Sequence, residues 1–281
     1  MTKLKLSGVS KAYGATLALR RGDLELDTGE VHVLIGANGS GKSTLCKIVA
    51  GSVRPDAGDV LLDGRAVTVS GPRAAQALGI GIFYQELSLA DHRSVAENIC
   101  LPDLPKQSGF FIDRAALREK AERYIALFEA VAGAELRADT NVGDLRADQR
   151  QLVEIMKALA TEAPVLIFDE PTSALDRAQV DRFFEILRDL RNDGRSIVFI
   201  SHRMDEIFAI GDRVTVIRDG ETIDTMAIAE TTPEAVIHMM VGEQEELAAT
   251  QQAAPPAQAA STDAALTVEN LTGAGFRDVS F

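Results

Sequence analysis

The chain has 281 residues and a formal net charge of −13, from 29 lysines and arginines against 42 acidic residues. Such an acidic balance argues against a broad nucleic-acid-binding surface, which needs clustered cations. Hydrophobic residues make up 46% of the chain and charged residues 25%, which allows a globular protein with a sizeable core.

The first sixty or so residues predict strands joined by tight turns. Asp27-Thr28-Gly29 separates two apolar runs, and Asp63-Gly64 lies between two more, which is typical of a hairpin. The run 31–35 is almost wholly apolar, as expected for a strand that is buried on both faces.

From about residue 88 to residue 160 the pattern is helical. Asp113 is the expected N-cap of a helix whose apolar residues recur at steps of three and four, namely Leu117, Ala121, Tyr124, Phe128 and Val131. A second helix carries Leu152, Ile155, Met156 and Leu159 on one face. We expect an all-helical insert here.

Strands and helices alternate after the insert. The predicted elements are a buried strand at 165–168, a helix at 178–191, a strand at 196–200, a hairpin with strands at 214–217 and 222–223, and a helix from Thr232-Pro233-Glu234 to Gly242. This order predicts an αβ core that the helical insert interrupts.

The last forty residues change in character. Residues 244–264 are rich in Ala, Gln, Pro, Ser and Thr and contain no aromatic residue, so we expect a linker there. Residues 266–272 then repeat the pattern of residues 4–10. We therefore expect one domain at 1–243, a linker at 244–264, and at 265–281 the truncated start of a second copy, as in a fragment of a tandem protein.

Residues 36–43, Gly-Ala-Asn-Gly-Ser-Gly-Lys-Ser, match the pattern G-x-x-x-x-G-K-[ST]. The pattern follows an apolar strand and precedes a helical run at 44–50, which is the context that a phosphate-binding loop requires. Backbone N–H groups would wrap the β-phosphate, Lys42 would reach the β- and γ-phosphates, and the Ser43 hydroxyl would ligate Mg²⁺. The alternative is a glycine-rich turn with a solvated lysine.

Asp169 and Glu170 follow the predicted strand at 165–168. A carboxylate at a strand end beside a phosphate loop is suited to a Mg²⁺ complex, and the adjacent Glu170 is placed to act on an attacking water. Taken alone, two acidic residues in this position more often cap a helix.

Further residues follow in a set order: Gln85 after a strand-like run at 80–84, Thr172-Ser173-Ala174-Leu175-Asp176 after the acidic pair, and His202 at the end of the strand at 196–200. Over residues 3–243 this set resembles the nucleotide-binding domain of ABC transporters. Looser segments at 58–60, 63–64, 85–89 and 94–99 resemble the first ATPase half of tandem importers for ribose, galactose, xylose and related monosaccharides. The implied fold is α/β, a P-loop NTPase core with an N-terminal antiparallel β subdomain and an inserted α-helical subdomain.

The resemblance implies a role for each matching residue. ATP would be bound by Tyr13, Gly36, Asn38, Gly39, Ser40, Gly41, Lys42, Ser43, Thr44 and Gln85. Mg²⁺ would be bound by Ser43, Gln85 and Asp169. The catalytic residues would be Glu170, which acts on water, His202, which bonds the γ-phosphate, and Lys42, which neutralises charge.

Several of these residues also have an ordinary structural interpretation. Tyr13 alone is a half-buried strand aromatic, a lone Gln85 is a surface residue, and an isolated His202 at a strand end is structural. Asp176, which the resemblance would place between two ATPase halves, alone caps the following helix.

The sequence departs from the family at its Leu-Ser-Gly-Gly-Gln signature. Leu145-Arg146-Ala147-Asp148-Gln149 occupies that place, so Arg146 replaces the serine that would bond a γ-phosphate across a dimer, and Asp148 replaces a glycine. A carboxylate near a γ-phosphate is a like-charge contact that costs on the order of a few kcal/mol at an effective dielectric near 20. Asp148 at a helix start also favours the helix dipole.

The resemblance implies an ATP-hydrolysing subunit that energises monosaccharide import. Its partners would be a second ABC domain of the same full-length chain, transmembrane permease subunits and, indirectly, a periplasmic or extracellular sugar-binding protein, and no nucleic acid. No run approaches the roughly 20 apolar residues of a membrane-spanning helix, and Cys46 and Cys100 form no disulfide framework. We therefore expect a peripheral protein at the cytoplasmic face of the membrane.

Two other functions stay open. A soluble tandem ATPase that acts on ribosomes would need basic patches and a long charged linker, which the composition opposes. A nucleotide-gated module with little hydrolysis is suggested by the altered signature. A small GTPase is disfavoured because the chain contains no Asn-Lys-x-Asp motif.

Overall fold

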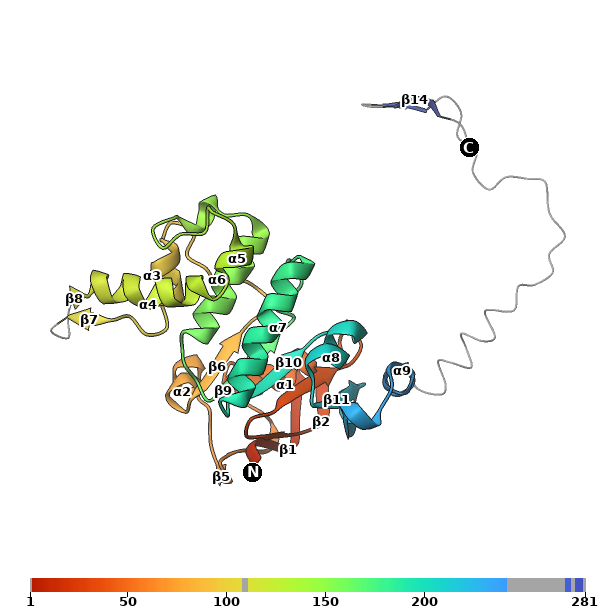
Figure 1. Ribbon diagram of the computed structural model, residues 1–281. Helices are drawn as coiled ribbons and strands as arrows, with labels where there is room; N and C mark the ends of the chain where they lie inside the picture. The colour runs from red at the N-terminus through yellow and green to blue at the C-terminus, as the bar shows by residue number, and fades with distance from the viewer. Residues whose placement is uncertain (1, 108–110, 242–270, 274–275, 280–281) are drawn as a thin grey trace. The chain divides into compact units, whose positions relative to one another are not determined.

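A mixed sheet runs through the first of the two units of the chain, Met1–Val241 (Figure 1). The computed structural model describes residues 2–107, 111–241, 271–273 and 276–279. Within them the sheet has ten strands in the order β5-β4-β1-β2-β12-β11-β3-β10-β9-β6. Their bounds are β1 (Thr2–Tyr13), β2 (Thr16–Asp27), β3 (Val31–Ile35), β4 (Ala57–Leu62), β5 (Arg65–Ala66), β6 (Ile80–Phe83), β9 (Val165–Asp169), β10 (Ser196–Ile200), β11 (Arg213–Arg218) and β12 (Glu221–Ala227).

The sheet joins two kinds of strand pairing. β1, β2, β4 and β5 are antiparallel neighbours, and the Asp63-Gly64 turn connects β4 to β5 as predicted. β3, β6, β9, β10 and β11 run parallel to one another. The sheet with its helices is therefore the α/β core, with an antiparallel N-terminal part, that the sequence predicts.

Helices cover both faces of the parallel strands. Leu166 and Phe168 of β9 share a core with α7 (Arg177–Asn192), whereas Val165 and Ile167 share another with α1 (Lys42–Val49). Because successive side chains of a strand point to opposite faces, α7 and α1 lie on opposite sides of the sheet. The remaining helices of the core are α2 (Pro72–Ala77), α8 (Met204–Ile210), the 3₁₀ turn η2 (Ile228–Glu230) and α9 (Pro233–Val241).

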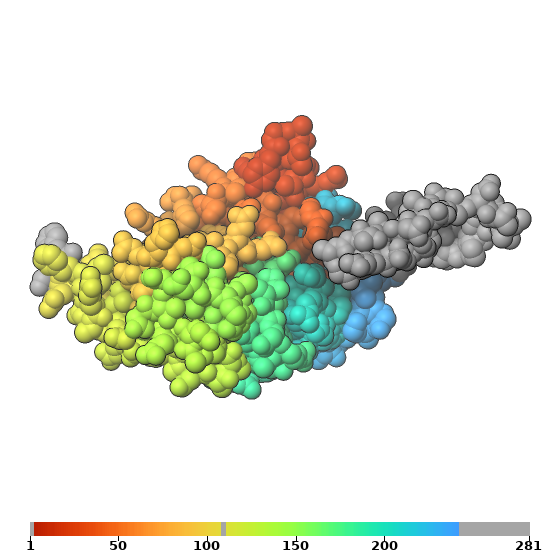
Figure 2. All heavy atoms as spheres, turned by 90° about the horizontal axis from the view of Figure 1, so that it is seen from above, coloured from red at the N-terminus to blue at the C-terminus, as the bar shows by residue number. Residues whose placement is uncertain are grey.

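The helical subdomain lies to one side of this unit, in yellow to green in Figure 2. It contains α3 (Val95–Ile99), α4 (Arg114–Ala126), α5 (Glu129–Ala132), the 3₁₀ turn η1 (Val142–Asp144) and α6 (Ala147–Leu159). Asp113 caps α4 as predicted, since its carboxylate accepts hydrogen bonds from the N–H groups of Ala115 and Ala116.

Two expectations for this subdomain are wrong. It is not all-helical, because β7 (Lys106–Gln107) and β8 (Phe111–Ile112) form a short antiparallel pair. The helix that begins after Asp113 does not continue to Val131 but ends at Ala126, and α5 begins at Glu129. The spacing of apolar residues continues across this break because Phe128 is fully buried in the same core.

The second unit is residues 242–281, in which β13 (Leu271–Gly273) pairs with β14 (Phe276–Val279). The predicted linker at 244–264 lies outside the described residues, as does most of the repeat at 266–272. Among the described residues, no helix combines the length and apolar character that a membrane crossing needs.

Candidate functional site

The loops after four parallel strands meet at one edge of the sheet. β3 leads into the loop 36–43, β6 precedes Gln85, β9 ends at Asp169, and His202 follows β10. Because the strands are parallel, their carboxyl ends lie at the same edge, where open α/β sheets bind ligands.

The backbone of the loop 36–43 depends on its glycines. Gly39 and Gly41 have φ values of 81° and 109°, in the left-handed region that favours glycine. A Cβ on Gly36 would lie 2.1 Å from the carbonyl oxygen of Ile217, so only glycine fits there. The Ser40 hydroxyl is buried and has no hydrogen-bond partner among the described residues. An orphan hydroxyl within a glycine-rich loop before a helix fits an anionic phosphate ligand.

Lys42 points back into this loop. Its ammonium donates hydrogen bonds to the carbonyl oxygens of Gly36 at 2.7 Å and Ala37 at 3.0 Å, and the residue is only 7% exposed. Burial lowers the pKa of Lys42, and the negative charges of Glu170 and Asp169 partly offset this effect. The Lys42 ammonium is therefore fixed by hydrogen bonds within the loop and is not exposed to solvent as the alternative interpretation would require.

Asp169 and Ser43 form the second part of the site. Burial and the neighbouring charge of Glu170 raise the pKa of Asp169, while a hydrogen bond with Ser43 and the charge of Lys42 act against that shift. A carboxylate and a hydroxyl are the oxygen ligands that Mg²⁺ takes, together with water and substrate phosphates. No group of three or more His, Cys, Asp and Glu residues that could hold a metal occurs in the described part of the chain. Asp169 and Ser43 thus fit a Mg²⁺ that takes further ligands from water and substrate phosphates.

Glu170 lies between two of the other predicted residues. Its Oε2 accepts a hydrogen bond from Gln85 Nε2 at 3.1 Å, and its Oε1 lies 3.4 Å from His202 Nδ1. The backbone of Glu170 has a φ of 51°, which is uncommon for a residue with a side chain, and its N–H donates to the Ile200 carbonyl. The structure thus brings together Lys42, Ser43, Gln85, Asp169, Glu170 and His202.

The remaining predicted residues lie as follows. Asn38 is exposed at the tip of the loop, and Thr44 lies in the first turn of α1. Tyr13 ends β1 and is 46% exposed, with its ring 5.9 Å from Lys11 Nζ. The contacts found among the described residues do not join Tyr13 to the loop 36–43.

The segment in the place of the family signature is held by contacts within the chain. Arg146 donates two hydrogen bonds to Asp148, which also accepts one from Gln179 Nε2 at 3.0 Å. Gln179 in turn bonds Asp176, whose carboxylate caps α7. Asp176 therefore has its ordinary capping role, and its segment is joined to the signature position through Gln179.

Glu206 was missed in the sequence analysis, which also assigned no role to Ser201 or Thr172, although Thr172 belongs to the segment 172–176 that it singled out. The carboxylate of Glu206 accepts hydrogen bonds from Thr172 and Ser201, which flank the site. Their sequence positions gave one signal, because Ser201 directly precedes His202 and Thr172 lies two residues after Glu170. No sequence pattern predicted that Thr172 or Ser201 would form a hydrogen bond with Glu206.

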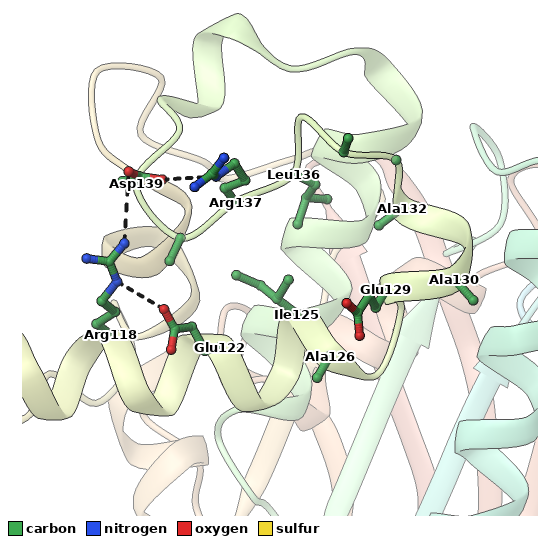
Figure 3. A pocket seen from close by; sticks show the side chains of 13 residues that line it. Arg118, Glu122, Ile125, Ala126, Glu129, Ala130, Ala132, Leu136, Arg137 and Asp139 are labelled. Carbon is green, nitrogen blue, oxygen red and sulfur yellow. Dashed lines mark hydrogen bonds and ion pairs between the residues drawn. The ribbon is translucent and has the colours of Figure 1, made fainter.

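A hollow of about 610 Å³ lies on the helical subdomain, lined by residues of α4, α5 and the loop that follows (Figure 3). Four of its charged residues form ion pairs, since Arg118 lies 3.0 Å from Glu122 and 3.9 Å from Asp139, and Arg137 lies 3.9 Å from Asp139. None of the predicted site residues lines it.

Comparison with known proteins finds one family model and several curated relatives that match the chain. Residues 19–173 match the sequence model of the family described as ABC transporter. The chain is 46% identical over 280 residues to a putative ribose/galactose/methyl galactoside import ATP-binding protein 1 of Burkholderia lata, an alignment that covers 99% of this chain and 53% of that protein. It is 44% identical over 269 residues to the ribose import ATP-binding protein RbsA of Chromobacterium violaceum, covering 96% of this chain and 52% of that protein. The chain thus spans about half the length of the curated relatives it matches.

Solved structures show the same fold. A nucleotide-free ATP-binding cassette from an ABC transporter superposes with a TM-score of 0.72 at 25% identity, over 86% of this chain and all of the other. A cassette solved as a dimer in a post-hydrolysis state, bound to ADP and Pi, superposes with a TM-score of 0.70 at 26% identity, over 80% of this chain and 98% of the other. The fold predicted from the sequence is confirmed.

Proposed function

The chain belongs to the ABC transporter family, and on that premise we propose that it binds ATP with Mg²⁺ and hydrolyses it to drive monosaccharide import. The observation that carries the proposal is the position of Glu170, at the end of β9 between Gln85 and His202 and close to the charge of Lys42. The relatives are named as import ATP-binding proteins for ribose, galactose or methyl galactoside, which supports a monosaccharide as the imported substrate.

The loop 36–43 would hold the phosphates through its backbone N–H groups, and Lys42 would neutralise their charge. Ser43, Asp169 and Gln85 would hold Mg²⁺, which would supply further neutralisation of the phosphate oxygens. Tyr13 would stack on the adenine, with Asn38 and Thr44 completing the nucleotide contacts.

Hydrolysis requires a water molecule to attack the γ-phosphorus while the bond from that phosphorus to the bridging oxygen breaks and ADP leaves. Gln85 contacts one carboxylate oxygen of Glu170 and His202 lies near the other, so the orientation of the carboxylate is fixed. In that orientation Glu170 would position the water and polarise its O–H bond. His202, whose side chain is exposed, would bond the γ-phosphate.

Import would need partners. We propose transmembrane permease subunits that contact the region around Gln85, a second ABC domain that completes each nucleotide site, and a sugar-binding protein that delivers the substrate to the permease. The protein would then act at the cytoplasmic face of the membrane. An ATPase that acts on ribosomes is not favoured, because the relatives named above are import ATP-binding proteins.

Two measurements test the proposal. The purified chain should bind a fluorescent ATP analogue with an affinity that rises on addition of Mg²⁺. In a second experiment, residues 1–241 replace the matching half of the Chromobacterium violaceum ribose import protein. This chimera should support ribose uptake in cells that lack their own ribose import ATP-binding protein. Failure of the analogue to bind would overturn the ATPase proposal, whereas binding without uptake would overturn the sugar proposal alone.

A further inference from the structure

A buried carboxylate lies behind the candidate site. Glu206 on α8 is only 2% exposed. Its Oε2 accepts hydrogen bonds from two hydroxyls, Thr172 Oγ1 at 2.9 Å and Ser201 Oγ at 2.7 Å. Its Oε1 lies 3.0 Å from Arg203 Nη1, an ion pair without hydrogen-bond alignment. A buried carboxylate persists only where such partners offset its loss of hydration.

The two hydroxyls belong to the segments that carry the hydrolytic residues. Thr172 lies two residues after Glu170, and Ser201 directly precedes His202. The two segments also meet through the backbone, since the Glu170 N–H donates to the Ile200 carbonyl at 3.1 Å. Glu206 Oε2 therefore links the segment that carries Glu170 to the segment that carries His202.

We propose that Glu206 is a positioning residue for ATP hydrolysis, which fixes the Glu170 and His202 segments relative to each other through Thr172 and Ser201. This inference rests on the proposed function. In the described part of the chain no hydrogen bond or ion pair joins Glu206 to Glu170 or His202, so it acts through the two hydroxyls.

The backbone of Glu170 gives a physical reason for such an anchor. Its φ of 51° costs free energy unless the surrounding structure holds it. A hydrogen bond to a carboxylate is stronger than one to a neutral oxygen, and the bond from Thr172 to Glu206 acts two residues after this strained residue. Because a displacement of about 1 Å in a catalytic group can cost about 100-fold in rate, a small relaxation here has a large effect.

The test compares four variants of the 281-residue chain. Thr172→Val and Ser201→Ala each remove one hydroxyl, Glu206→Gln keeps an acceptor oxygen, and Glu206→Ala removes both contacts. The control is Glu30→Gln, which changes another buried carboxylate, 6% exposed, at the opposite end of β3 from the phosphate loop. Thermal unfolding reports the stability of all five proteins.

Three measurements separate positioning from stability. The Glu170 N–H donates to the Ile200 carbonyl and the Arg203 N–H donates to Ser201 Oγ at 3.1 Å. Amide hydrogen exchange should be about tenfold or more faster than in the unaltered chain at Glu170 in Thr172→Val, Ser201→Ala and Glu206→Ala, and at Arg203 in Thr172→Val and Glu206→Ala, where its acceptor is still present. Hydrolysis of labelled ATP should fall about tenfold in kcat with KM within twofold, and Glu206→Gln should retain most of it. Ser201→Ala should in addition lower the preference for ATP over ADP, because His202 is assigned to the γ-phosphate.

The outcomes are distinguishable. Unchanged exchange at Glu170 in Thr172→Val and Ser201→Ala would overturn the positioning role even if the chain proved to be an ATPase. The same holds if Glu30→Gln, at equal thermal stability, slowed hydrolysis as much as Thr172→Val. A chain that bound no ATP would overturn the proposed function, while the exchange rates would still decide whether Glu206 holds the two segments.

Discussion

Arg146 and Asp148 face each other as an ion pair, with Nε donating to Oδ1 and Nη2 donating to Oδ2 at 3.2 Å each. Burial alone would raise the pKa of Asp148, but hydrogen bonds from Gln179 and Arg146 hold that pKa below its ordinary value. Hydrogen bonding and the charge of Asp148 also raise the pKa of Arg146. The position where the family has a serine donor and a glycine therefore presents a paired cation and anion.

This pair predicts two unequal nucleotide sites in a tandem protein. One site would join the intact loop 36–43 to the signature of the second half, and the other would join the Arg146–Asp148 pair to the second half's loop. In the full-length protein, Arg146→Ser with Asp148→Gly should change total turnover by less than about twofold, because that site contributes little. Lys42→Ala should abolish most of the turnover. If the Lys42 variant kept half of the activity, the two sites would be equivalent.

The 281-residue chain should bind ATP yet hydrolyse it slowly by itself. Two copies pairing with each other would offer only Arg146 and Asp148 to the opposite γ-phosphate. Hydrolysis measured against protein concentration should stay low and rise only in proportion to it. Fast hydrolysis that grew with the square of the concentration would contradict this prediction.

Lys42→Ala should weaken ATP binding about 10- to 100-fold. Hydrogen bonds to charged groups contribute about 1.5–3 kcal/mol, and each 1.4 kcal/mol is a tenfold change in affinity. The measurement is a titration with a fluorescent ATP analogue. Lys5→Ala, which removes an exposed lysine paired with Glu25 on the N-terminal strands, is the control and should leave the affinity unchanged.

Glu170→Gln should keep ATP binding and lose turnover about 100-fold or more, the usual contribution of a general base. The amide retains the shape of the side chain but not the charge that polarises water. Binding and hydrolysis are measured on the same preparation, with Glu185→Gln on the exposed surface of α7 as a matched control. Normal turnover in the Glu170 variant would show that another group activates the water.

Asp169 should give the site a pH dependence. Its pKa is raised, so between the ordinary value of 3.8 and the raised value the folded chain binds more protons than the unfolded chain. The free energy of unfolding therefore falls as pH rises through this window and stays lower above it. Mg²⁺-dependent ATP affinity should fall on acidification at a higher pH than an unperturbed aspartate would allow.

Asp169→Asn separates these effects. At neutral pH the variant should have a higher thermal unfolding midpoint than the unaltered chain, because a buried charge next to Glu170 is removed. It should also lose the Mg²⁺ dependence of ATP binding. Asp59→Asn, a change at an exposed position of β4, is the control. A lower midpoint for Asp169→Asn at neutral pH would contradict the assignment.

Local sequence patterns predicted most of the fold and part of the site. The run 31–35, the turn at Asp63-Gly64 and the cap at Asp113 depend on neighbouring residues, and the structure has all three. Gln85, Glu170 and His202 were each placed after a strand, and the parallel sheet then brings them together. The short helices α2 and α8 were not predicted, because six or seven residues give too little periodicity.

The contacts that the sequence did not reveal join distant parts of the chain. Thr172 and Glu206 lie 34 positions apart, and Asp148 and Gln179 lie 31 apart. The break between α4 and α5 was also missed, because buried Phe128 continues the apolar spacing across it. Each of these features depends on tertiary packing between residues that are distant in the sequence, and a local sequence pattern does not predict such packing.

The order of the strands in the sheet has a consequence for how the protein folds. Spatially β10 lies between β3 and β9, although it is made after both. β10 hydrogen-bonds to both β3, which leads into the phosphate loop, and β9, which ends at Asp169, so this link is missing until Ser196–Ile200 has left the ribosome and inserted. Insertion of a central parallel strand is a slow, non-local step. A nascent chain that ends before residue 196 should therefore be unable to retain nucleotide, even though its phosphate-binding loop is already complete.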